Sequence, residues 1–228
     1  MRKKLLRCTQ AQISTATFDS MRFKNLSDKT FVRLKIIVFL LALCPLVKLI
    51  FYGCLDILGA NPIEKITRTT GYWTLLFLLI TLAATPIRRL LKWQWVNRLR
   101  RMLGLFSFFY GCLHFLTYLI LDHFFDWEAI LKDILKRPYI TVGFVAFVLM
   151  LPLAITSSES MMRRLGGKRW RLLHRLVYVT AIAGVVHYWW LVKKDLTDPI
   201  IFGVVLANLL SIRIFYKLKK PLIKPGGQ

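Results

Sequence analysis

Three of the four histidines in this 228-residue chain lie inside strongly apolar stretches, where an ionisable side chain is unusual. They are His114, His174 and His187, whereas His123 follows Asp122 in a more polar stretch and is typical of a solvated or interfacial residue. An ionisable side chain inside a membrane-spanning segment is costly and usually functional. For any one of the three, a hydrogen-bonded structural histidine would be the commoner explanation, so their joint placement decides the interpretation.

His114 and His187 lie near the outer ends of two apolar segments that run in the same direction. At a rise of about 1.5 Å per residue, the two side chains are within about 5 Å of equal depth. Two neutral imidazoles at one depth on parallel helices can supply the fifth and sixth ligands of a haem iron. Gly111 and Gly184 leave room for a flat ring, although small residues also favour close helix packing. The pattern predicts a haem site in the outer half of a helix bundle.

His174 precedes His187 by thirteen residues, which places it about 20 Å lower on one helix. On an ideal helix the two side chains would point in different directions, so a shared role requires the helix to deviate. Arg100 and Arg101 occupy the facing position on the other segment. Two alternatives follow. A second haem could use His174 as its single histidine ligand, or the arginines could contact the propionates of one haem while His174 has another role.

The sequence contains no phosphate-binding glycine loop, no GxGxxG dinucleotide motif, no HExxH motif and no GxSxG motif. We therefore predict no catalytic residue in this chain. The predicted metal ligands are His114, His174 and His187, and Arg101 joins them as a predicted cofactor-binding residue.

The elements that position these residues are six apolar segments in a chain that is 56% hydrophobic. We predict an all-α fold, a polytopic membrane bundle of six transmembrane helices. Pro86 and Pro152 lie near the inner ends of the second and fourth segments, where neighbouring helices can satisfy the freed carbonyls. The predicted spans are Leu34–Tyr52, Tyr72–Ile87, Met102–Leu121, Ile140–Thr156, Leu172–Leu191 and Ile200–Tyr216.

The net charge of +23 is distributed unevenly between the two sides of this bundle. With the N-terminus inside, 26 of the 34 Lys and Arg residues lie on the inner side, and eight of the 11 acids lie on the outer side. This is the asymmetry of the positive-inside rule, so both termini are predicted to be cytoplasmic. Because the cations occur in blocks between apolar stretches, and not along one polar face, a nucleic-acid partner is not expected.

The charge map divides the chain into a basic cytoplasmic tail (1–33), the six-helix haem domain (34–216) and a basic cytoplasmic tail (217–228). Only twelve residues follow Tyr216, so no attached soluble domain is expected. The chemistry should take place within the bundle or on a partner. The basic inner loops are expected to contact haem propionates, anionic lipids or a cytosolic flavin reductase.

Several stretches of the chain resemble the MsrQ (YedZ) family of bacterial haem-binding membrane subunits, within the ferric-reductase-like transmembrane group. The similarity covers about Leu34 to Lys219, and its most specific part is the W-x-x-L-H-x-L-x-Y spacing around His174, with His187 thirteen residues on. The stretches are RRMLGLFSFFYGCLHFLTYLILD (Arg100–Asp122), RPYITVGFVAF (Arg137–Phe147) and LAITSSESMMRRLGGKRWRLLHRLVYVTAIAGVVHYWWLVK (Leu153–Lys193), with LGANP, TGYWTL and TPIRRL between Leu58 and Leu90.

This resemblance implies haem b between the helices of a bacterial inner-membrane protein, with FMN also associated with the family. It implies an oxidoreductase component that passes electrons from the quinone pool to MsrP, a periplasmic molybdopterin enzyme that repairs oxidised methionines. The functional histidines of the family match His114, His174 and His187. No residue pattern assigns FMN to a position in this chain, and the haem count stays open between one and two.

Two other functions remain as alternatives. One is a quinol-linked cytochrome b that serves another periplasmic acceptor, which the partner recovered with the protein would distinguish. The other is a non-redox membrane transporter or scaffold in which the histidines are structural. A haem spectrum separates that class from both redox classes.

Overall fold

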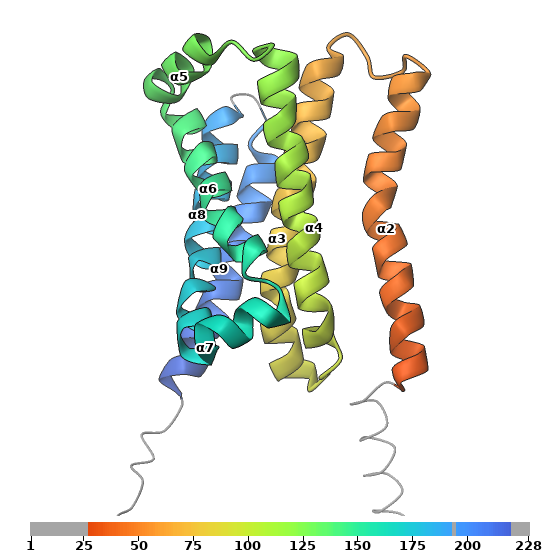
Figure 1. Cartoon of the computed structure of the whole chain (residues 1–228), viewed down its shortest axis with the longest axis vertical. Coiled ribbons are helices and arrows are strands. Elements are labelled where there is room, and N and C mark those ends of the chain that lie inside the picture. The colour runs from red at the N-terminus through yellow and green to blue at the C-terminus, as the bar shows by residue number, and fades with distance from the viewer. Residues whose placement is uncertain (1–26, 193–194, 220–228) are drawn as a thin grey trace, which may run out of the picture.

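The computed structural model describes residues 27–192 and 195–219, which are almost entirely helical. Long helices run alongside one another, while α5 and α7 lie across opposite ends of the bundle (Figure 1). The elements are α2 (Asp28–Cys54), α3 (Pro62–Leu91), α4 (Val96–Thr117), the π-helix η1 (Tyr118–Asp122), α5 (Trp127–Lys136), α6 (Pro138–Ile155), α7 (Glu159–Leu173), α8 (Leu176–Leu191) and α9 (Thr197–Leu218).

Helix α3 is the longest helix of the bundle and contacts α2, α4, α8 and α9. It begins ten residues before the predicted Tyr72 because the Asn61 side chain accepts a hydrogen bond from the Glu64 N–H at 3.2 Å and Pro62 suits the first turn. At the other end Pro86 leaves the Leu82 carbonyl without its usual helical donor. The Arg213 guanidinium of α9 donates to that carbonyl, which confirms the expectation that a neighbouring helix would satisfy it.

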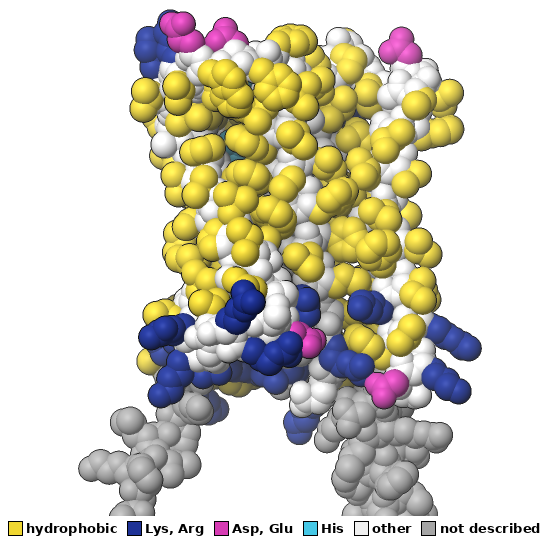
Figure 2. Space-filling model, viewed as in Figure 1, with side chains coloured by type: hydrophobic (Ala, Val, Ile, Leu, Met, Phe, Trp, Pro, Cys, Tyr) yellow, Lys and Arg dark blue, Asp and Glu magenta, His cyan; other side chains and the backbone are white. Residues whose placement is uncertain are grey.

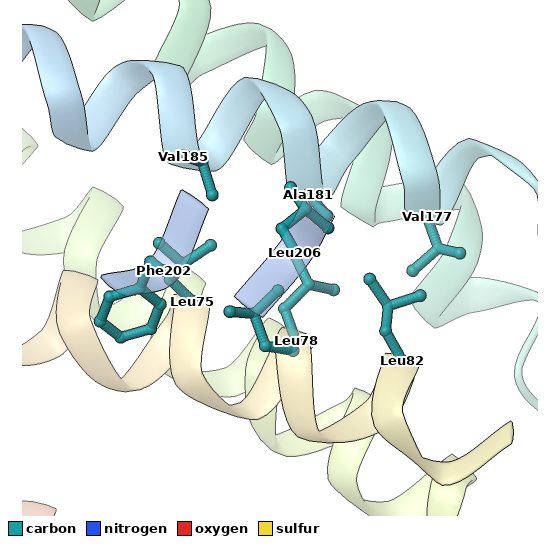
Figure 3. Packing of buried hydrophobic residues seen from close by; sticks show 9 residues of the cluster. Leu75, Leu78, Leu82, Val177, Ala181, Val185, Phe202 and Leu206 are labelled. Carbon is teal, nitrogen blue, oxygen red and sulfur yellow. The ribbon is translucent and has the colours of Figure 1, made fainter. Parts of the chain in front are cut away.

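Two hydrophobic clusters hold the helices together. In the first, Leu75, Leu78 and Leu82 of α3 pack against residues of α8 and α9 (Figure 3). Ala181 of α8 is fully buried there, and its small side chain lets α8 approach α3 closely. The second cluster joins α2, α3 and α4, and its members include Phe31, Ala42, Phe77, Leu99, Leu103, Phe106 and Tyr110.

The predicted span Leu172–Leu191 is wrong at its inner end. The chain turns at His174 and Arg175, so the amphipathic helix α7 ends at Leu173 and the apolar helix α8 begins at Leu176. The segment before the turn is rich in Arg and Lys, and burying it in a bilayer would be costly. His174 therefore lies at a corner between two helices and not on a continuous helix below His187.

The lengths and apolar surface of the helices show a multi-pass membrane protein. Five segments are long and apolar enough to cross a bilayer, namely α2, α3, α4 with η1, α6 and α9, and α8 is apolar but has only 16 residues. Figure 2 shows hydrophobic side chains along the bundle and Lys and Arg gathered at the end that carries α7. Helix α2 begins and α9 ends at that same basic end (Figure 1).

The predicted tails lie largely outside the described residues, which exclude 1–26 and 220–228. Within the described part, α2 already begins at Asp28 and α9 continues to Leu218. The helices thus extend beyond the predicted domain limits at residues 34 and 216.

Candidate cofactor site between α4 and α8

Two cavities lie one above the other between the helices. The cavity farther from the basic end, which we call the outer cavity, has a volume of about 540 Å³ and is lined from α3, α4, η1, α5, α6 and α8. The inner cavity, nearer the basic end, has a volume of about 420 Å³. Leu78 and Met150 line both cavities, so the two cavities adjoin at these side chains. Both volumes fall within the range of about 300–1,000 Å³ that small-molecule and cofactor sites occupy.

His114 lies on α4 and lines the outer cavity. Its Nδ1 is 2.9 Å from the backbone carbonyl oxygen of Thr67 on α3. A carbonyl oxygen can only accept, so Nδ1 carries the proton and donates, and Nε2 keeps its lone pair. This is the arrangement that orients a histidine for binding a metal through Nε2.

His187 lies on α8 and is held in the same way from another helix. Its Nδ1 is 2.6 Å from the carbonyl oxygen of Tyr139 on α6, which again leaves Nε2 free to bind a metal. Helix α3 packs along α4, and α6 along α8, more extensively than any other pairs. Each histidine is therefore oriented by the helix that packs most closely against its own.

The two histidine rings both line the outer cavity and lie edge to face, with centroids 6.1 Å apart and planes at 72°. With metal–nitrogen bonds of about 2.0 Å and ring centroids about 1.1 Å beyond each nitrogen, two imidazoles on opposite sides of one metal would be about 6.2 Å apart. Within the described residues, no group of three or more His, Cys, Asp or Glu is placed to hold a metal ion. Two histidines alone suit an iron that already has four ligands from a macrocycle, which is the situation of haem.

Two glycines make room for these rings. A Cβ added at Gly71 of α3 would lie 3.0 Å from Cε1 of His114, and one at Gly143 of α6 would lie 2.6 Å from Nδ1 of His187. Each glycine follows by four residues the one whose carbonyl accepts from the histidine, Thr67 and Tyr139. None of these four residues was predicted from the sequence, although the same spacing of four separates Thr67 from Gly71 and Tyr139 from Gly143.

The outer mouth of this cavity carries polar and charged groups. The Tyr118 hydroxyl is buried and has no hydrogen-bond partner among the described residues. His123 contacts the Tyr118 ring, and its Nε2 is 3.3 Å from an Asp133 carboxylate oxygen. Arg137 pairs with the same carboxylate at 3.3 Å, and Arg68 of α3 also lines the cavity. The cavity thus combines an apolar interior with hydrogen-bond donors at its outer end. His123, expected to be solvated or interfacial, lies at this outer end with most of its side chain buried.

His174 lines the inner cavity together with Arg100 and Arg101. Its Nδ1 is 3.1 Å from the Trp170 carbonyl oxygen, and its ring stacks on the Trp170 indole with centroids 3.9 Å apart. The indole N–H donates to the Thr156 carbonyl at 2.9 Å, which fixes the stack. Arg101 is 3.7 Å from Glu159. The described structure brings His114 and His187 together and places His174 and Arg101 in a separate cavity.

Comparison with known proteins identifies the family. Residues 70–185 match the model described as "Ferric reductase like transmembrane component". A "Protein-methionine-sulfoxide reductase heme-binding subunit MsrQ" from Herminiimonas arsenicoxydans is 59% identical over 189 residues, covering 82% of this chain and 87% of that protein. Proteins of the same name from Rhodospirillum rubrum (56% over 183 residues; 79% and 86% covered) and Xanthomonas euvesicatoria (50% over 169 residues; 74% and 77% covered) are also similar. The chain belongs to the MsrQ family.

Membership in this family confirms the resemblance seen in the sequence. The matched region 70–185 contains Gly71, His114, Gly143 and His174, and His187 follows it by two residues. No solved structure matches the chain.

Proposed function

We propose that this chain is a haem b membrane subunit that carries electrons for a protein-methionine-sulfoxide reductase. The observation that supports this most directly is the pair His114 and His187, each with Nδ1 held by a carbonyl and their rings 6.1 Å apart. The similar proteins are named as heme-binding subunits of that reductase system. A bound haem would supply one-electron chemistry at a depth between the two membrane surfaces.

His114 and His187 would hold the haem iron through their Nε2 atoms. Thr67 and Tyr139 would keep both Nε2 atoms unprotonated, since each carbonyl accepts a hydrogen bond from a protonated Nδ1. The carboxylates of the macrocycle would find donors at the outer mouth, where the Tyr118 hydroxyl has no partner among the described residues and Arg68 and Arg137 line the cavity.

The inner cavity would take a second cofactor, with His174 as its single histidine ligand and Arg101 near its carboxylates. Support comes from the stack on Trp170, which fixes the His174 ring, and from the fact that Leu78 and Met150 line both cavities. Electrons could pass from the inner cavity to the outer one across this short partition. FMN, implied by family resemblance, is retained as a further cofactor to which we assign no residue.

The topology we propose has six spans with both termini in the cytoplasm. Helix α8 counts as the sixth span because it is apolar throughout and packs along α6 and α9 in the bundle. The end that carries the Lys and Arg residues would be cytoplasmic by the positive-inside rule. The exposed basic residues of α7, among them Arg163 and Arg164, would then face anionic lipid headgroups or a cytosolic flavin reductase.

With that topology, the electron donor would be a quinol in the membrane and the acceptor the periplasmic MsrP. The outer cavity opens beside Arg68 and Arg137, so an acceptor docked on the outer loops could approach the haem edge. The purified subunit in lipid should be reduced by a quinol analogue and reoxidised by added MsrP. Rapid reduction by NADPH, with no flavin reductase present, would contradict this direction. Failure of MsrP to reoxidise the reduced subunit would favour another periplasmic acceptor.

A further inference from the structure

Three arginines from different helices come together near the basic end of the bundle. Arg88 lies on α3, Arg100 on α4 and Arg213 on α9. Arg88 and Arg100 lie on either side of the short connection between α3 and α4, and Arg213 reaches α3 through its hydrogen bond to the Leu82 carbonyl. All three side chains are partly buried, and none of them forms an ion pair with a described residue. The described acids at this end, Asp28 and Glu159, pair with other arginines.

The groups that do contact this cluster are neutral. Arg213 donates to the hydroxyl of Tyr178 and to the carbonyl of Leu82, which Pro86 leaves free. The Nε–H groups of Arg88 and Arg213 are buried and have no acceptor among the described residues. Neutral acceptors fix Arg213 in place but do not compensate its charge. Three cations with two unpaired donors in a partly dry environment are unfavourable unless an anion joins them.

The depth of the cluster indicates which anions could reach it. Arg88 is three residues from the end of α3, Arg100 four from the start of α4 and Arg213 five from the end of α9. At about 1.5 Å per residue, each lies within about 8 Å of a helix end. This is where lipid headgroups meet the bilayer interior, and where soluble anions also have access. Guanidinium groups bind phosphate oxygens through paired hydrogen bonds, and converging arginines are typical of phosphate sites.

We propose that Arg88, Arg100 and Arg213 form a binding site for a phosphate group, supplied by an anionic phospholipid or by a soluble phosphate. The site goes beyond the proposed electron-transfer function, because it needs neither haem nor a redox partner. Arg100 belongs to this site and also lines the inner cavity, so phosphate binding would stabilise this end of the bundle.

The test compares thermal unfolding of the haem-loaded protein in three media: phosphatidylcholine nanodiscs, the same nanodiscs with phosphatidylglycerol, and the first nanodiscs with added inorganic phosphate. The variant R88Q/R100Q removes two of the three cations and leaves the Arg213 contacts in place. The control R163Q/R164Q removes the same charge from the exposed side of α7. A ligand that binds only the folded state raises the unfolding midpoint, so the shift measures binding.

Wild type should gain stability from phosphatidylglycerol or from phosphate. R163Q/R164Q should keep most of that gain, because the headgroup contacts of exposed arginines are screened and weak, and R88Q/R100Q should lose most of it. Losing two charged hydrogen-bonding partners should weaken binding at least tenfold. In phosphatidylcholine alone, R88Q/R100Q should be at least as stable as wild type, because two repelling charges are gone. A gain from phosphatidylglycerol alone identifies a lipid, and a gain from inorganic phosphate identifies a soluble source.

An equal response in wild type and R88Q/R100Q would overturn the site. If R163Q/R164Q lost as much of the stability gain as R88Q/R100Q, the site would also be overturned, because the gain would then belong to the basic surface in general. Loss of haem absorbance in R88Q/R100Q with an unchanged lipid and phosphate response would assign these arginines to a haem carboxylate instead.

Discussion

A Cβ atom added at Gly143 of α6 would lie 2.6 Å from Nδ1 of His187 on α8, a distance that real Cβ contacts essentially never show. The crowded atom is the one that donates to the Tyr139 carbonyl, so the ring cannot move away without losing that hydrogen bond. Gly71 stands in the same relation to His114, with 3.1 Å between the added Cβ and Nδ1. Because neither glycine has a side chain, both proposed haem ligands have room in the positions where their hydrogen bonds hold them.

Gly143→Ala should displace the His187 ring and lower the content of low-spin haem. Overpacking a filled site costs about 1–3 kcal/mol, which corresponds to about fivefold to 150-fold weaker binding. Haem titration of the purified variant, followed by absorbance, measures this loss. Gly203→Ala on α9 is the matched control, since its added Cβ would meet Val185 at an ordinary 3.8 Å. Equal haem affinity in both variants would show that Gly143 does not position the ligand.

Tyr118→Phe should weaken haem binding without destabilising the haem-free protein. The Tyr118 hydroxyl is buried and has no hydrogen-bond partner among the described residues, so removing it should not lower the stability of the haem-free protein. In the haem-bound protein the same change would remove a hydrogen bond to a carboxylate, which is worth about 1.5–3 kcal/mol and hence tenfold or more in affinity. Unfolding of the haem-free protein and haem titration separate the two effects. A variant that unfolds earlier and binds haem normally would show a structural role for the hydroxyl.

His174→Ala should remove one haem equivalent from the inner cavity and leave the low-spin signal of the outer haem intact. We expect this result because His174 lines the inner cavity and not the outer one. Haem extraction quantified against protein, together with the low-spin spectrum, gives the answer. Unchanged haem stoichiometry would mean that a single haem is bound and that His174 has another role.

The sidedness of the protein can be tested with reporter fusions. Fusions after Lys219 and within 88–101 should report a cytoplasmic location, and a fusion within 126–136 should report a periplasmic one. The reason is the concentration of Lys and Arg at one end of the bundle. The reverse pattern would invert the proposed direction of electron flow.

The sequence carried enough information to predict the helical bundle and the pairing of His114 with His187, because both depend on local composition and on depth along a helix. It could not show that the chain breaks at His174, since the apolar residues Leu172 and Leu173 hide the end of α7. It also could not show that Gly71 and Gly143 make room for the two histidine rings. A glycine in an apolar helix is common, and its role depends on which helix lies against it.

The central claim is that His114 and His187 together would hold one haem, and its most direct test is the spectrum of the two single alanine variants. Wild type should show a low-spin haem with a Soret band and split α and β bands on reduction. His114→Ala and His187→Ala should each lose at least one low-spin haem equivalent, while both proteins remain in the membrane. Full haem content with an unchanged low-spin spectrum in either variant would contradict the account.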